Sequence, residues 1–193
     1  MIEKKDVQKT HRSTSLWVNI LIWIGILALL GLLAYSLLSK ASLISIGDEI
    51  PDFSFTTFEG FEYEGSAKFS LSQLRGKVVL INFWASWCKP CEGEAADLEQ
   101  AWRHYQPEGK VVFLGVDYVD TEPEARAYLA KFDISFPNGP DLGTRISQIF
   151  SRNLGVPETY ILDENGILQF IKIGPFLSLD AIITAIESVE SGD

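Results

Sequence analysis

The sequence predicts an α/β domain, with a central mixed sheet flanked by helices, preceded by one membrane-spanning helix. Three observations predict this architecture. A stretch of 23 residues near the N-terminus contains no charged side chain. Two nearly all-apolar segments, separated by a helical pattern, are typical of strands that are buried on both faces. An Asn-Gly pair between two further apolar runs indicates an antiparallel hairpin, which makes the sheet mixed.

The apolar stretch covers residues 16–38. At about 1.5 Å per residue, a helix of this length spans roughly 34 Å, enough for a bilayer core of about 30 Å. A buried soluble helix is rarely so long, and a cleaved signal peptide usually has a shorter apolar core and a better cleavage site than Ser39-Lys40-Ala41. We therefore expect a retained membrane anchor.

The basic residues around this anchor predict its orientation. Lys40 alone follows it closely, whereas four basic residues precede it: Lys4, Lys5, Lys9 and Arg12. The positive-inside rule then makes residues 1–15 a cytoplasmic tail and exports the rest, with 39–50 as a tether and 51–193 as the domain. The predicted location is the cell membrane, crossed once, with the C-terminal domain outside the cytoplasm.

Charge and cysteine content exclude several classes of protein. The formal net charge of −10 disfavours nucleic acid as a partner, because phosphate binding requires clustered Lys and Arg. Without the four positive and two negative charges of the tail, 12 positive and 24 negative residues remain, so the exported part is strongly acidic. Two cysteines can neither build a disulfide-rich scaffold nor supply four zinc thiolates.

Local patterns predict the elements of the domain in chain order. Alternating aromatic and polar residues at 52–63, around Glu59-Gly60, indicate a hairpin, and a short turn or helix follows at 71–77. The capping box that starts at Thr121 predicts a helix running to about Phe132. The other predicted elements are strands at 78–84, 110–117, 160–163 and 167–173, and helices at 92–105, 144–150 and 179–189.

The two cysteines, Cys88 and Cys91, lie where the first central strand gives way to a helix. Residues i and i+3 of a helix share one face, with Cα atoms about 5–6 Å apart, which is within disulfide range. The helix N-terminus and the neighbouring Lys89 favour the thiolate of Cys88, and Pro90 suits the first turn. We expect Cys88 to attack a substrate disulfide and Cys91, further inside, to resolve the mixed disulfide.

Two other roles for this cysteine pair are weaker. A static disulfide over so short a loop would constrain the unfolded chain only slightly. A metal site would need further ligands, but His11 precedes the membrane span and His104 lies about 20 Å along the helix from Cys91. We therefore expect no metal, and no cofactor other than the redox-active Cys88–Cys91 disulfide itself.

Four residues near the cysteines are further candidates for the site. Glu94 lies close to the apolar stripe of the helix, one turn from Cys91, so partial burial should raise its pKa and suit it to proton exchange with that thiol; a solvated surface glutamate is the alternative. Asn82 is a lone polar residue in an apolar strand and should hydrogen-bond near the site. Trp84 is expected to be structural, and Trp87 to form a contact surface beside Cys88.

The segment from Asn82 to Cys91 (NFWASWCKPC), together with Glu94, resembles the thioredoxin superfamily, and within it the membrane-anchored TlpA/ResA/CcmG (DsbE) group. The resemblance covers residues 46–190 and implies a thioredoxin-like fold. A second stretch, Gly155 to Tyr160 (GVPETY), is similar to the superfamily loop that carries a cis-proline beside the dithiol. By that resemblance Pro157 is the cis residue, and Val156 offers backbone groups to a substrate strand.

The resemblance also implies a function. The predicted activity is that of a thiol–disulfide oxidoreductase, a reductase that keeps the haem-attachment cysteines of apocytochrome c reduced and is recharged by a transmembrane dithiol carrier of the CcdA/DsbD type. Substrate contacts would come from Trp87, Lys89, Pro90, Val156 and Pro157. The alternatives are a TlpA-like reductase for copper-site or oxidase assembly, and a non-catalytic assembly factor that binds a thiol or a metal.

Two stretches depart from the family pattern and bear on substrate identity. Residues 151–153 (SRN) replace the usual lead-in to the proline loop, and residues 65–69 (GSAKF) resemble a small insertion. Neither departure touches the cysteine motif.

Overall fold

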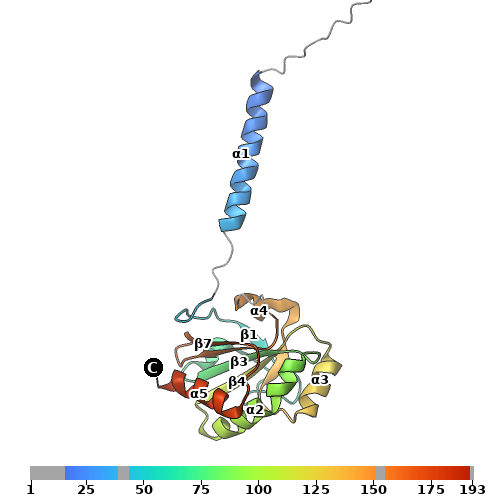
Figure 1. Ribbon diagram of the computed structural model, residues 1–193, viewed down its shortest axis with the longest axis vertical. Coiled ribbons are helices and arrows are strands. Elements are labelled where there is room, and N and C mark those ends of the chain that lie inside the picture. The colour runs from blue at the N-terminus through green and yellow to red at the C-terminus, as the bar shows by residue number, and fades with distance from the viewer. Residues whose placement is uncertain (1–15, 39–43, 151–154, 192–193) are drawn as a thin grey trace, which may run out of the picture. The chain divides into compact units, whose positions relative to one another are not determined.

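A computed structural model describes residues 16–38, 44–150 and 155–191 of the chain (Figure 1). Helix α1, Leu16–Leu38, forms one unit, and the domain that begins after the tether forms a second. By length and composition α1 could cross a membrane, and the side chains described in it are exposed. The predicted cytoplasmic tail, residues 39–43 of the predicted tether and residues 151–153 lie outside the described residues.

The domain is built on a five-stranded sheet with the strand order β5-β4-β3-β6-β7. Strands β5, β4 and β3 are parallel to one another, β6 runs antiparallel to β3, and β7 runs antiparallel to β6. The predicted mixed sheet is thereby confirmed. The strands are β3 (Val78–Trp84), β4 (Val111–Asp117), β5 (Asn138–Pro140), β6 (Glu158–Leu162) and β7 (Leu168–Ile173).

Helices and a small hairpin cover the two faces of this sheet (Figure 1). Successive side chains of a strand point to opposite faces, and in β3 Leu80 joins one apolar core whereas Ile81 joins the other. The first core is completed by α2 (Lys89–Tyr105), α3 (Glu122–Lys131) and α5 (Leu179–Glu190). The second is completed by α4 (Arg145–Ile149) and by the hairpin of β1 (Ser54–Thr56) and β2 (Lys68–Ser70).

The N-terminal hairpin differs from the predicted one. The expected turn at Glu59-Gly60 does not join paired strands; instead β1 pairs with β2, with Phe55 opposite Phe69. The Phe58 N–H donates to the carbonyl of Asn138 at 2.8 Å, so the chain after β1 is drawn onto β5 rather than folding back at once. Residues 68–69, interpreted from sequence as part of an insertion, therefore belong to the partner strand.

Strand β5 was not predicted at all. Its three residues, Asn138–Pro140, have low strand propensity and include a proline. The strand nevertheless forms at the edge of the sheet, where Asn138 pairs with Gly115 of β4. A proline is tolerated at an edge because no further strand needs its missing N–H.

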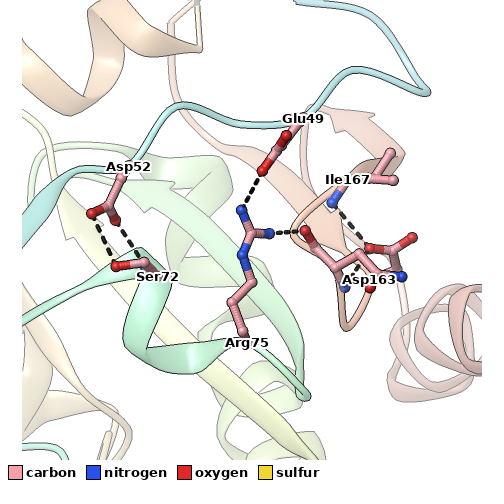
Figure 2. A network of polar contacts seen from close by, with 7 residues as sticks. Glu49, Asp52, Ser72, Arg75, Asp163 and Ile167 are labelled. Carbon is pink, nitrogen blue, oxygen red and sulfur yellow. Dashed lines mark hydrogen bonds and ion pairs between the residues drawn. The ribbon is translucent and has the colours of Figure 1, made fainter.

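The predicted tether is shorter than residues 39–50, because residues 44–50 belong to the domain. Glu49 pairs with Ile167, and the Ile50 side chain is only 1% exposed. The Arg75 guanidinium donates to the Glu49 carboxylate at 2.6 Å and to the Asn165 carbonyl (Figure 2). These contacts fix the start of the domain to the β6–β7 hairpin.

A second pair of contacts holds the next residues of the chain in place. The carboxylate of Asp52 accepts hydrogen bonds from the backbone N–H and the hydroxyl of Ser72, at 2.8 and 3.0 Å (Figure 2). Ser72 lies in the short 3-10 helix Leu71–Leu74, which confirms the turn or helix predicted at 71–77. The domain therefore begins before residue 51.

Candidate active site

The cysteine pair lies at the start of α2, just after the end of β3. Strand β3 ends at Trp84, a short loop follows, and Cys88 is the N-cap of α2, so the helix begins earlier than the predicted residue 92. Cys88 and Cys91 form a disulfide with their Cα atoms 5.3 Å apart, within the range expected for i and i+3 in a helical turn. Both cysteines are buried in this oxidised form.

Hydrogen bonding at the helix N-terminus favours negative charge on Cys88. The Cys91 N–H donates to the Cys88 Sγ at 3.1 Å, and the positive end of the helix dipole acts in the same direction. Lys89 contributes less than its position in the sequence indicates, because its side chain is 82% exposed and is paired with Glu92 at 2.9 Å. Pro90 occupies the first turn of α2, as expected.

Glu94 is the buried acid of the site. It follows Cys91 by one helical turn and is 1% exposed. Its Oε2 accepts a hydrogen bond from the Phe176 N–H at 2.7 Å, and its Oε1 accepts one from the Asn82 side chain at 2.9 Å. Burial raises the pKa of Glu94 from 4.5 to about 7, although both hydrogen bonds and the charge of Lys172 act to lower it. The alternative of a solvated surface glutamate is therefore wrong.

Asn82 and Trp84 support the site from β3. The Asn82 amide, also buried, donates to the Thr159 hydroxyl at 3.0 Å as well as to Glu94, so it joins α2 to β6. Trp84 is buried, donates from Nε1 to the Asn138 side chain at 2.9 Å, and stacks on Tyr128. The expected hydrogen bonding of Asn82 near the site and the structural environment of Trp84 are both present.

The residues predicted to contact substrate lie at the same end of the sheet. Trp87, immediately before Cys88, is 61% exposed. The Val156–Pro157 peptide bond is cis, as the family resemblance implied. Pro157 directly precedes β6, whose first residue, Glu158, pairs with Phe83 near the end of β3. The proline loop therefore lies at the end of the sheet where β3 ends and the cysteine loop starts.

Residues 46–171 match the family described as AhpC/TSA, and they make up more than half of the chain. The chain belongs to the AhpC/TSA family. It is 36% identical over 132 residues to the thioredoxin-like protein YneN of Bacillus subtilis, covering 68% of this chain and 73% of YneN. It is 31% identical over 135 residues to the thiol-disulfide oxidoreductase ResA of Bacillus cereus, covering 69% of this chain and 73% of ResA.

Solved structures agree on the fold of this AhpC/TSA family member. A thiol:disulfide interchange protein of the thioredoxin family from Chlorobium tepidum superposes with a TM-score of 0.63 at 22% identity, covering 78% of this chain and 99% of the other. The thioredoxin-like fold and the resemblance to the TlpA/ResA/CcmG group are confirmed. With its cysteine pair and its ResA relatives, the protein is a thiol–disulfide oxidoreductase of the ResA type.

Sequence reasoning missed three partners of the site in this oxidoreductase. Thr159 lies within the proline-loop motif but had no predicted side-chain role, and Asn138 belongs to the strand that was not predicted. The third is the Phe176 backbone N–H, which carries no side-chain signature. The roles of Cys88, Cys91 and Glu94 in catalysis stay predictions.

Proposed function

We propose that this oxidoreductase is a reductase held on the outer side of the cytoplasmic membrane by α1. The length and composition of α1 and the four basic residues before it support this arrangement. The observation that carries the proposed chemistry is the combination, on one helix, of the Cys88–Cys91 pair with a buried glutamate whose pKa is about 7.

The proposed reaction begins from the reduced pair. The Cys88 thiolate attacks one sulfur of a substrate disulfide; that bond breaks, a mixed disulfide forms, and the second substrate sulfur leaves as a thiolate and takes up a proton. Cys91 then attacks the Cys88 sulfur and releases the first substrate sulfur. Two electrons have passed to the substrate, and the Cys88–Cys91 disulfide remains on the enzyme.

Glu94 would assist the attack of Cys91 on the Cys88 sulfur. Cys91 must lose its proton before its sulfur can act as a nucleophile, and buried surroundings disfavour a free thiolate. The Glu94 carboxylate lies one turn away on the same helix, and a pKa of about 7 lets it both accept and return a proton near neutral pH. Asn82 and the Phe176 N–H hold the carboxylate in place.

For the substrate, we propose the disulfide that forms between the haem-attachment cysteines of apocytochrome c. The resemblance to the TlpA/ResA/CcmG group supports this choice. A transmembrane dithiol carrier of the CcdA/DsbD type would return the enzyme to its reduced form. Trp87, Lys89, Pro90, Val156 and Pro157 would contact the substrate around the reacting sulfurs.

Reduction of two peptides by the full-length protein tests this proposal. One peptide contains an apocytochrome c haem-attachment motif with its cysteines joined as a disulfide, and the other is a disulfide peptide of equal length without the motif. We expect the reduced protein to convert the first peptide faster, with one equivalent of Cys88–Cys91 disulfide formed per peptide reduced. Equal rates would contradict the choice of substrate, and no reduction of either peptide would contradict the proposed reductase.

A further inference from the structure

A small cavity lies beside the cysteine loop, at the end of β4 and the start of the segment after β5. Its volume is about 250 Å³. Three aspartates line it, Asp117, Asp120 and Asp141, together with two apolar side chains that are exposed, Val119 and Leu142. This size suits a single amino-acid side chain better than a whole small molecule, whose pockets usually measure about 300–1,000 Å³.

The cavity is joined directly to the loop that carries Cys88. The Asp120 Oδ2 accepts a hydrogen bond from the Ser86 N–H at 2.5 Å, and Ser86 precedes Cys88 by two residues. The Tyr118 N–H donates to the Trp84 carbonyl at 2.8 Å and holds the two loops together. An extended chain advances about 3.3–3.6 Å per residue, so a residue close to a substrate's cysteine can reach this cavity.

The acids of the cavity lack a counter-charge of their own. Within the described part of the chain, no ion pair joins Asp117, Asp120 or Asp141 to a basic side chain. The Asp141 carboxylate accepts hydrogen bonds from the backbone N–H groups of Ile146 and Ser147, each at 2.8 Å. Asp120 is only partly buried and has the Ser86 N–H as a neutral donor.

Asp117 is the innermost of the three acids. Its side chain is 2% exposed, and its Oδ1 has no hydrogen-bond partner among the described residues. Burial is the main cause that raises the pKa of Asp117 to about 8. A hydrogen bond to Asp120 and the charges of Asp120 and Asp141 act in the same direction. A cation that entered the cavity would compensate these carboxylates and draw Asp117 toward its ionised form.

The mouth of the cavity indicates what kind of cation fits. Leu142 is 75% exposed, and Val119 is held exposed by a backbone with φ of 59°, a conformation rare for a β-branched residue. An apolar mouth above an acidic interior matches a long aliphatic stem that ends in a charge, as in lysine and arginine. The described residues contain no group of three or more His, Cys, Asp or Glu arranged to hold a metal ion.

We propose that this cavity is a substrate subsite that takes a lysine or arginine side chain located near the cysteine under attack. The proposal rests on the proposed reductase function and adds to it a class of substrate: proteins with a basic residue close to the disulfide. The charge would sit among Asp117 and Asp120, and the stem would pack on Leu142. Binding of the substrate would thereby also align its disulfide with Cys88.

Two disulfide peptides that differ in one residue beside the cysteine test this subsite. One carries lysine and the other norleucine, which has the same carbon chain without the charge. Full-length protein turns over each with dithiothreitol as reductant at pH 7. We expect kcat/KM to be about tenfold higher for the lysine peptide, a factor equivalent to about 1.4 kcal/mol, and we expect the ratio to shrink in 0.5 M salt.

The double variant Asp117→Asn/Asp120→Asn should bring this ratio close to one, because it removes the charge but keeps an amide oxygen for the Ser86 N–H. The matched control, Glu187→Gln/Glu190→Gln, neutralises two exposed acids on α5 and should keep the wild-type ratio. A ratio of one in the wild-type protein, or an equal fall in both double variants, overturns the subsite. If neither peptide is reduced faster than by dithiothreitol alone, the proposed reductase function itself has failed.

Discussion

Replacement of Cys88 with serine is expected to abolish disulfide reduction. A serine hydroxyl cannot open a disulfide. Cys91 lies inside α2 and lacks the N-cap position, with its hydrogen bond to Sγ, that favours a thiolate at Cys88, so it should not take over the first attack. Reduction of insulin by the full-length protein, followed by turbidity, is the measurement. We expect the rate with Cys88→Ser to equal the rate with reductant alone.

The control for Cys88→Ser is the stability of the protein. The variant lacks the Cys88–Cys91 bond, so its urea denaturation must be compared with that of the reduced wild-type protein, which lacks the bond as well. We expect the two midpoints to agree closely. Activity above background in a folded Cys88→Ser protein would show that another group begins the reaction.

Replacement of Glu94 with glutamine is expected to change both the pH dependence of resolution and that of stability. Resolution by Cys91 requires Glu94 as a carboxylate, so the wild-type rate should rise with pH and level off above about 7, the pKa of Glu94. Glu94→Gln should be slower by about 10²–10⁴-fold, the usual contribution of a general base or acid, and should lack this inflection. Stopped-flow measurement of resolution between pH 5 and 9 tests it.

The stability of the oxidised protein should respond to Glu94→Gln in a defined pH window. The pKa of Glu94 is raised on folding. The contribution of the neutral Glu94 side chain to stability is therefore fully present below pH 4.5 and is lost as pH rises through about 7. The rise in the pKa of Glu94 from 4.5 to about 7 corresponds to about 3 kcal/mol of free energy of unfolding. Relative to wild type, Glu94→Gln should therefore gain roughly that much free energy of unfolding between pH 4.5 and 7.5, because glutamine does not ionise.

The matched control for both experiments is Glu99→Gln. Glu99 is another buried glutamate of α2, but it is paired with Arg103 at 2.6 Å and accepts a hydrogen bond from the Ser135 N–H at 2.8 Å. Loss of these contacts should lower stability without removing the inflection near pH 7 from resolution. If the inflection near pH 7 survives in Glu94→Gln, or disappears in Glu99→Gln, the assignment of Glu94 as the group that exchanges a proton with Cys91 is contradicted.

The elements around the cysteines could be predicted from the sequence because their signals are local. Seven consecutive apolar or amide residues mark β3, the capping box marks the start of α3, and the Asn-Gly turn marks the β6–β7 hairpin. By contrast, β1, β2 and β5 have three residues each and are defined by their partners. No local pattern indicates that residues 54–56 pair with 68–70 rather than folding back at Gly60.

The same distinction holds within the candidate site. The position of Glu94 one turn from Cys91 follows from helical spacing, and so does its nearness to the apolar stripe. Its burial depends on the loop that carries Phe176, 82 residues further along the chain, whose N–H donates to the carboxylate. Likewise, the sequence does not indicate which charged neighbour Lys89 pairs with. The structure shows that it pairs with Glu92.

The most direct test of the central claim is to map the covalent intermediate. Without the Cys91 thiol, the mixed disulfide cannot be resolved from within the enzyme. Reduced full-length Cys91→Ser is mixed with a disulfide peptide, alkylated, and analysed by intact mass and by peptide mapping. We predict a one-to-one adduct linked through Cys88. Failure of the folded variant to form any adduct with Cys88 would contradict the assignment of Cys88 as nucleophile and Cys91 as resolving thiol.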